Sequence, residues 1–162
     1  MRRALLTRFR VKPDPARPEH FEVLVFATKA AMCAHYANGC SLDEIQWRKG
    51  FGLGDFDFTA ITIGWTRIKI QPDGTETVHP NIGQILFHHE NDRIGAELVS
   101  HEMSHAVLMW FEHGGHPWDS LVPGHDWNEA VCLAQGRMVG QFWRKWYRWQ
   151  DRHAQKKGEH TI

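Results

Sequence analysis

The clearest chemical signal in the chain is the run His101, Glu102, Met103, Ser104 and His105. On an α-helix, residues four apart lie on one face about one turn apart, so both imidazoles can reach one metal ion. Glu102 then lies to one side of the pair, where its carboxylate can take a proton from water rather than bind the metal. The spacing therefore predicts a metal site with its own general base.

The helical pattern around His101 and His105 supports the metal interpretation. The two histidines fall within about 40° of each other at 100° per residue, and the apolar residues fall on the opposite side of the helix. A histidine that only packs in the core would lie within that apolar stripe. Asn91 or Asp92 is the expected N-cap, and the glycine pair at 114–115 is the expected stop. The apolar stripe consists of Ala96, Val99, Met103, Ala106, Val107 and Trp110.

Two histidines leave a tetrahedral zinc site incomplete, and Glu129 is the best candidate for a third ligand. It lies on the next expected helix, and several residues there fall within about 60° of it. Small residues on this face would let the two helices approach closely and bring a short carboxylate to the ion. The residues of this face are Cys132, Leu133, Gly136 and Gly140.

Glu129 also has a purely structural interpretation. Asp126 precedes it by three residues, which is a capping-box pattern, so Glu129 could simply cap its own helix. In that case the histidines near the metal helix become the alternative third ligands. These alternatives are His113, His116 and His125.

The remaining sequence predicts the elements that must position these residues. The order is strands and one helix first, then two helices, which predicts an α+β fold with helices covering one side of a small sheet. The last two helices are the active-site helix and the following glutamate-bearing helix, and the whole chain, 1–162, forms one domain. Strands are expected at 4–11, 22–27, 58–70 and 82–89, helices at 29–39, 92–113 and 126–150, a loop at 50–57 and a turn at 72–74.

Residues 141–157 predict a basic aromatic C-terminal helix. One interpretation is a surface for single-stranded nucleic acid or an acidic partner. The favoured interpretation is an apolar stripe that packs on the domain and leaves a basic face in water. The pattern interleaves Trp143, Trp146 and Trp149 with Arg144, Lys145 and Arg148.

The motif at 101–105, followed by Glu129 and Ala130, resembles the zincin metallopeptidases in their gluzincin-like arrangement. Over residues 82–140 the chain is most similar to small bacterial and phage proteins of the ImmA/IrrE-like type. The resemblance implies a small mixed β-sheet with an active-site helix, a zinc ion, and hydrolysis of an amide bond in a peptide or protein substrate. It also implies that His101, His105 and Glu129 are ligands and that Glu102 is the general base. The chain departs from the SprT-like proteins in lacking a zinc ribbon. It also lacks an obvious helix-turn-helix.

The same resemblance implies an edge strand beside the active-site cleft, and residues 82–89 occupy that place in the chain order. An open strand edge can pair with an extended peptide, and Gly83 would permit a close backbone approach. Neighbouring residues on a strand alternate, so one of His88 and His89 could point into the cleft. An exposed position at the strand end is favoured for each of them.

Composition limits the remaining function classes. The chain has 162 residues, with 19 Lys and Arg against 19 Asp and Glu, so its net charge is zero. Binding of nucleic acid or an anionic membrane through overall charge is therefore not indicated. Three cysteines without a C-x-x-C pair argue for a reducing, cytoplasmic compartment. No apolar run approaches the length that spans a bilayer. Nucleic acid remains a partner only through the C-terminal helix.

These observations predict a zinc-dependent hydrolase, in particular a peptidase. A rival hypothesis is a zinc-bearing binding protein of a phage or mobile element, with little or no turnover, that engages a host protein or DNA. The presence of Glu102 argues against the rival, because a purely structural metal site does not need a base.

Overall fold

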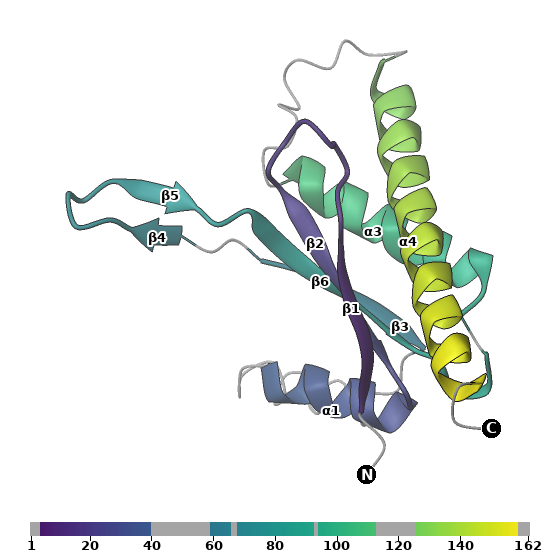
Figure 1. Ribbon diagram of the computed structural model, residues 1–162. Coiled ribbons are helices and arrows are strands. Elements are labelled where there is room, and N and C mark those ends of the chain that lie inside the picture. The colour runs from purple at the N-terminus through teal and green to yellow at the C-terminus, as the bar shows by residue number, and fades with distance from the viewer. Residues whose placement is uncertain (1–3, 40–58, 66–67, 93, 113–125, 159–162) are drawn as a thin grey trace, which may run out of the picture.

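Figure 1 shows a computed structural model of the protein, which describes residues 4–39, 59–65, 68–92, 94–112 and 126–158. The expected α+β class is confirmed, while the expected loop at 50–57 lies outside the described residues. The strands are β1 (Leu5–Val11), β2 (His20–Phe26), β3 (Ala60–Gly64), β4 (Ile68–Ile70), β5 (Glu76–Val78) and β6 (Asn81–His88). The helices are α1 (Lys29–Gly39), the short 3-10 helix η1 (Glu90–Asp92), α3 (Ala96–Trp110) and α4 (Asp126–Gly158).

The main sheet has four strands in the order β1-β2-β6-β3. The two central strands, β2 and β6, are parallel, and each outer strand is antiparallel to its neighbour. Both faces of these two strands are covered where each carries a run of apolar residues, Val23–Phe26 in β2 and Ile85–Phe87 in β6. The expectation of an edge strand at 82–89 is wrong, because β6 inserts between β2 and β3 and β3 becomes the edge strand.

Helices cover both faces of the sheet, with α3 and α4 on one side and α1 on the other (Figure 1). Phe21 and Val25 of β2 belong to the core under α3 and α4, whereas Leu24 and Phe26 pack with Met32 of α1. The expectation that helices cover one side only is therefore wrong for α1. The reason is that β2 carries apolar residues at both odd and even positions, so both of its faces need cover.

The expected long strand at 58–70 is divided between two sheets. β3 ends at Gly64, which pairs with Gly83 near the start of β6. Beyond Gly64, Trp65 still donates its backbone N–H to the Ile82 carbonyl of β6 at 3.0 Å and its indole N–H to the Asn81 carbonyl at 3.1 Å, and Asn81 is the first residue of β6. Farther along the chain, β4 pairs with β5 in a two-stranded hairpin that projects from the main sheet (Figure 1). The pairing partner, and not the apolar pattern of the segment, sets where the strand ends.

The expected turn at 72–74 is confirmed at the tip of this hairpin. Gly74 has a φ of 83°, a left-handed conformation that glycine adopts without steric cost. Asp73 Oδ1 accepts hydrogen bonds from the backbone N–H of Thr75 at 3.0 Å and from its hydroxyl at 2.7 Å. These contacts lower the pKa of the Asp73 carboxyl, since they favour its charged form.

Helix α3 carries the histidine motif, but its start differs from the expected one. Its N-cap is Gly95, which has no side chain that could cap the helix. Asn91 and Asp92, the expected caps, lie in η1, where Asn91 has a φ of 57° that interrupts a regular helix. The expected stop at 114–115 lies outside the described residues.

Helix α4 is one continuous helix of 33 residues, about 50 Å long at 1.5 Å per residue. The basic aromatic segment expected to be helical at 141–157 is its second half. The interpretation that an apolar stripe of this segment packs on the domain is confirmed, although Tyr147 is exposed. Phe142 and Trp146 are buried, and Trp143 and Trp149 are partly buried against them. In the part of the chain that the structure describes, every helix is too short or too polar to cross a membrane.

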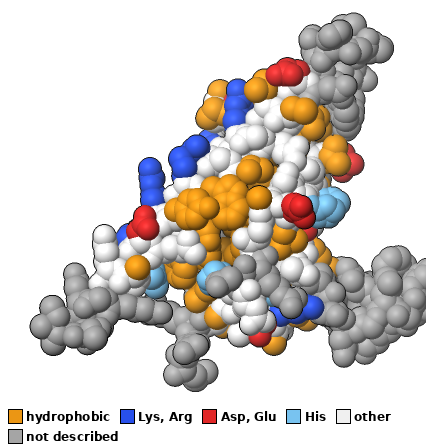
Figure 2. All heavy atoms as spheres, turned by 90° about the vertical axis from the view of Figure 1, so that its right-hand side faces the viewer, with side chains coloured by type: hydrophobic (Ala, Val, Ile, Leu, Met, Phe, Trp, Pro, Cys, Tyr) orange, Lys and Arg blue, Asp and Glu red, His pale blue; other side chains and the backbone are white. Residues whose placement is uncertain are grey.

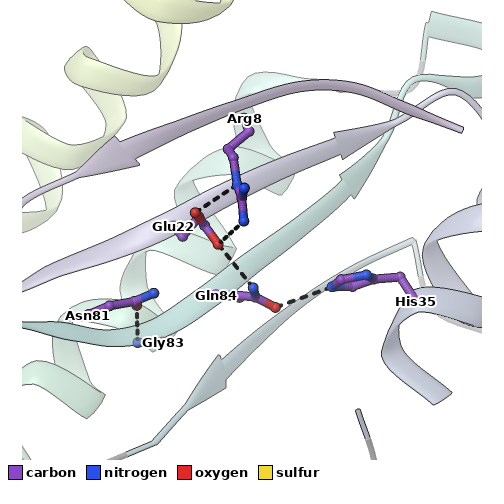
Figure 3. A network of polar contacts seen from close by, with 6 residues as sticks. All are labelled: Arg8, Glu22, His35, Asn81, Gly83 and Gln84. Atoms are coloured by element: carbon purple, nitrogen blue, oxygen red, sulfur yellow. Dashed lines mark hydrogen bonds and ion pairs between the residues drawn. The ribbon is translucent and has the colours of Figure 1, made fainter. Parts of the chain in front are cut away.

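A network of polar side chains lies on the α1 face of the sheet, next to the apolar part of that face (Figure 3). Arg8 of β1 forms an ion pair with Glu22 of β2 at 2.8 Å. Gln84 of β6 donates to the same Glu22 carboxylate at 3.1 Å, and His35 of α1 lies 3.4 Å from the Gln84 side-chain oxygen. The network links three adjacent strands and α1, so most of the Glu22 hydrogen-bonding capacity is used inside the fold.

Candidate metal centre

His101 and His105 lie on successive turns of α3, and both are exposed. Their ring centroids are 4.7 Å apart with the planes nearly perpendicular, and the two Nε2 atoms are 3.1 Å apart. The apolar stripe of the same helix, including Met103 and Val107, is buried in the core. The prediction that the histidines share a face opposite the core is confirmed.

The distance between the two Nε2 atoms fits a shared metal ion. In a tetrahedral zinc site with Zn–N bonds of about 2.0–2.1 Å, two ligand nitrogens lie about 3.3 Å apart. The observed 3.1 Å requires only a small adjustment of the rings. The same distance also suits a hydrogen bond between one protonated and one unprotonated ring nitrogen. His101 and His105 can therefore hold a metal ion or share a proton.

Glu102 is one of the few charged or polar side chains buried among the described residues, with 5% of its surface exposed. The hydroxyl of Thr62 on β3 lies 2.7 Å from its carboxylate and 3.0 Å from its backbone carbonyl. A buried carboxylate needs such donors to replace its lost hydration. Thr62 therefore anchors Glu102 between α3 and the edge strand.

Sequence reasoning missed Thr62, although one signal was available. It is the single hydroxyl residue in β3, whose sequence is AITIG. A polar residue within a short apolar strand needs a partner, and here the partner is the candidate base Glu102. The sequence does not reveal the order of strands in the sheet, and it is this order that brings Thr62 of β3 beside α3.

A second polar contact fixes α3 against α4 next to the histidines. Gln135 of α4 donates to the Ser104 hydroxyl at 2.8 Å and to the Ser100 hydroxyl at 3.0 Å. Ser104 in turn donates to the Ser100 backbone carbonyl at 2.9 Å. Because these two serines directly precede His101 and His105 in the sequence, the contact limits rotation of α3 about its axis.

Glu129, the expected third ligand, is exposed near the start of α4. The helix face expected to approach α3 is turned to solvent instead: Leu133 is 48% exposed, and nothing lies within 4 Å of a Cβ built on Gly136. Cys132, expected at a helix interface, is also exposed. The prediction about this face is wrong, because α4 packs through a different stripe. That stripe includes Ala134, Gln135, Met138 and Phe142.

The structure does not gather a complete set of metal ligands. Among the described residues, no three His, Cys, Asp or Glu side chains form a group that could hold a metal ion, so Glu129 is not brought together with the histidine pair. The alternative ligands His113, His116 and His125 lie outside the described residues. The third ligand stays a prediction.

The two histidines at the end of β6 are placed differently from expectation. His88 is 3% exposed and belongs to the α1 side of the sheet, where it pairs in register with Phe26. His89 is half-buried, and its ring lies edge-on against Trp146 with centroids 5.0 Å apart. The favoured exposed positions are wrong, because β6 is a central strand and its end is covered on both sides.

The edge strand beside the candidate site is β3. Thr62 contacts Glu102, and the Cβ position of Gly64 lies 2.9 Å from Met109 Sδ, so this strand runs closely along α3. Within the described residues, β6 is the only main-sheet strand paired with β3, and the other edge of β3 has no strand beside it. Among the described strands, the edge strand next to the active-site helix is therefore β3 and not the expected segment 82–89.

Comparison with known proteins gives no match: no family model, no curated protein and no solved structure is similar to this chain.

Proposed function

We propose that this protein is a zinc-dependent hydrolase, and specifically a peptidase. The observation that carries the proposal is the convergence of the His101 and His105 Nε2 atoms, 3.1 Å apart on an exposed helix face, with the buried carboxylate of Glu102 one residue after His101 on the same helix. A histidine pair serving only packing or solubility would not need a buried acid next to it. Burial of a carboxylate is costly, and such groups are typical of functional sites.

The residues of the chain have separate roles in the proposed amide hydrolysis. His101 and His105 hold the metal ion. A bound zinc ion supplies Lewis acidity, polarising the substrate carbonyl and making water a better nucleophile at neutral pH. Glu102 accepts the proton from the attacking water and then delivers it to the leaving amine. Thr62 holds the Glu102 carboxylate in place by donating to it at 2.7 Å.

The position of β3 at the edge of the described sheet supports a peptide, rather than a small amide, as the substrate. An extended peptide can add to a free strand edge through backbone hydrogen bonds. Thr62 lies in the middle of this strand and contacts Glu102. A peptide paired with β3 would therefore pass close to the proposed base.

The experiment compares the zinc-supplemented protein with Glu102→Gln, using a mixture of unstructured peptides and mass spectrometry to find cleavage products. Wild type should cleave, and Glu102→Gln should keep zinc while losing cleavage, because glutamine can still accept the Thr62 hydrogen bond but cannot take a proton. Glu97→Gln is the matched control, since Glu97 lies exposed in the first turn of the same helix. Full cleavage by Glu102→Gln, or loss of its zinc, would reject the assigned role.

A further inference from the structure

Two open hollows lie between the edge strand β1, with the residues that follow it, and the outer side of α4. We call them together the basic groove. One hollow is near the C-terminal half of α4 and the other near its N-terminal half. The first is lined by Thr7, Arg8, Phe9, Lys145, Arg148, Asp151, Arg152 and Gln155. The second is lined by Lys12, Pro15, Cys132, Leu133, Gly136, Arg137, Gly140, Gln141 and Arg144.

The basic groove concentrates positive charge that the whole chain does not have. Seven of its residues are Lys or Arg, of which Arg8 is paired with Glu22, and one, Asp151, is acidic. The complete sequence has 19 of each kind and no net charge. Figure 2 views this side of the molecule and shows the Lys and Arg side chains along one margin of the α4 face. A neutral protein with such an asymmetric surface presents a local positive field to a polyanion.

The cations form a row because of the helix period. Arg137, Arg144, Arg148 and Arg152 all lie on the outer side of α4 and are exposed. From the first to the last is about 22 Å at 1.5 Å per residue, which matches about six steps of a nucleic-acid duplex at 3.4 Å each. The guanidinium of Arg144 lies 3.3 Å from the Cβ position of Gly140, so the glycine leaves room for it.

The side of the groove next to β1 is fixed by hydrogen bonds. Gln141 accepts from the backbone N–H of Lys12 at 3.0 Å and donates to its carbonyl at 2.9 Å, much as a neighbouring strand would. Lys145 donates to the carbonyl of Arg10. Partial burial, together with Arg144 and Arg148, lowers the pKa of Lys145. The cations are therefore crowded on a rigid support, where a polyanion would relieve their repulsion.

Two features identify the kind of polyanion. Four of the five arginines lie on one rigid helix, and the planar guanidinium is suited to bidentate contact with phosphate. The tryptophans in the C-terminal half of α4 are buried or partly buried against the core, and the one aromatic residue among those lining the groove is the half-buried Phe9, fewer than the row of stacking side chains typical of single-strand binding. We propose that the basic groove between β1 and α4 binds the phosphate backbone of a nucleic-acid duplex without reading its sequence.

The test measures binding of a labelled DNA duplex of about 20 base pairs, longer than the arginine row at 3.4 Å per step, by fluorescence anisotropy. Wild type should bind with an affinity that falls steeply between about 50 and 200 mM salt. Arg144→Gln/Arg148→Gln should lower the slope of log affinity against log salt by about two, which is about one for each phosphate that the variant leaves without its arginine. Both side chains are exposed, so the variant should fold and melt like wild type.

The control variant is Lys69→Glu, which changes the net charge by the same two units on the exposed hairpin strand β4. It should leave both the affinity and the salt slope unchanged. The proposal is overturned if wild type does not bind the duplex at about 50 mM salt, where phosphate contacts are strongest. It is also overturned if Lys69→Glu weakens binding as much as the double variant. The proposal is also overturned if a DNA single strand binds more tightly than the duplex. The same holds if polyglutamate of the same charge displaces the labelled duplex as well as unlabelled duplex does.

Discussion

The Glu102 carboxylate is removed from water, and a buried carboxylate destabilises a fold unless donors replace its hydration. The hydroxyl of Thr62 lies within hydrogen-bonding distance of it from the neighbouring strand. The acid therefore depends on a residue outside its own motif, 40 positions earlier in the chain. At the scale of single residues, the candidate site includes Thr62 as a positioning residue for the proposed base.

Thr62→Val should therefore impair both stability and hydrolysis. Valine has nearly the same shape but cannot donate, so the carboxylate would lose a hydrogen bond worth about 1.5–3 kcal/mol for a charged acceptor. Chemical denaturation should show a lower free energy of unfolding, and peptide cleavage should slow with zinc content unchanged. Thr62→Ser, which keeps the hydroxyl, should restore both properties. A valine variant that unfolds and cleaves like wild type would show that the hydroxyl does not position Glu102.

Glu129→Gln tests whether the exposed carboxylate near the start of α4 binds the metal. Because the structure does not gather Glu129 with His101 and His105, we expect unchanged zinc affinity in a chelator competition. The change in volume is small, and glutamine also serves in a capping box, so stability should be retained as well. A loss of zinc affinity beyond the roughly 10–100-fold typical of an outer-shell residue would instead establish Glu129 as a ligand.

The contrast between the histidine pair and Glu129 shows what a sequence can predict at this scale. The relation of His101 to His105 depends only on the helix period, which is local and well determined. The relation of Glu129 to the pair depends on which stripe of α4 packs against α3. The long aromatic stripe of α4, through Phe142 and Trp146, decides that orientation and turns the face of small residues to solvent.

At the scale of elements, the central position of β6 determines the site, because it leaves β3 at the edge beside α3. At Gly83, β6 is closely enclosed by its neighbouring strands. A Cβ there would lie 2.3 Å from the Ile63 carbonyl oxygen of β3 and 2.6 Å from the ring of Phe21 on β2. The glycine permits the close approach that the sequence suggested, but to its own neighbouring strands rather than to a bound peptide.

Gly83→Ala should consequently destabilise the whole sheet. The added methyl group would have to displace the backbone of β3 or the buried Phe21 ring, and overpacking of this kind costs about 1–3 kcal/mol or more. Thermal melting should show a clear drop in Tm. Gly136→Ala is the matched control, because its Cβ meets open space within an exposed helix turn. It should be neutral or slightly stabilising, since alanine has the higher helix propensity. Equal melting temperatures for the two variants would contradict the close packing at Gly83.

The elements themselves could be predicted better than their arrangement. The helix at 29–39 and the strands near 4–11, 22–27 and 82–89 follow from local patterns, and the structure places them within about two residues of the expected ends. Sheet order does not follow from local patterns. It depends on which strands can bury both faces, and the short apolar runs Val23–Phe26 of β2 and Ile85–Phe87 of β6 are the signal that both lie in the centre.

At the scale of the whole molecule, the two proposed surfaces lie at opposite edges of the sheet. The histidine pair and Glu102 are beside β3, and the basic groove lies along β1. The apolar core between the sheet and the two long helices separates them. Substitutions in the arginine row should therefore leave zinc binding intact, and substitutions in the histidine motif should leave duplex binding intact. The two proposals can fail independently.

The most direct measurement of the central claim is the zinc content of the protein, by elemental analysis after purification without chelators and after zinc supplementation. We predict about one zinc ion per chain, as for a single catalytic site. His101→Asn/His105→Asn should bind none at the same protein concentration. His153→Asn should bind zinc like wild type, because His153 is also exposed on a helix but contacts the Trp149 carbonyl. Wild type without any transition metal, or a double variant that keeps its zinc, would contradict the account.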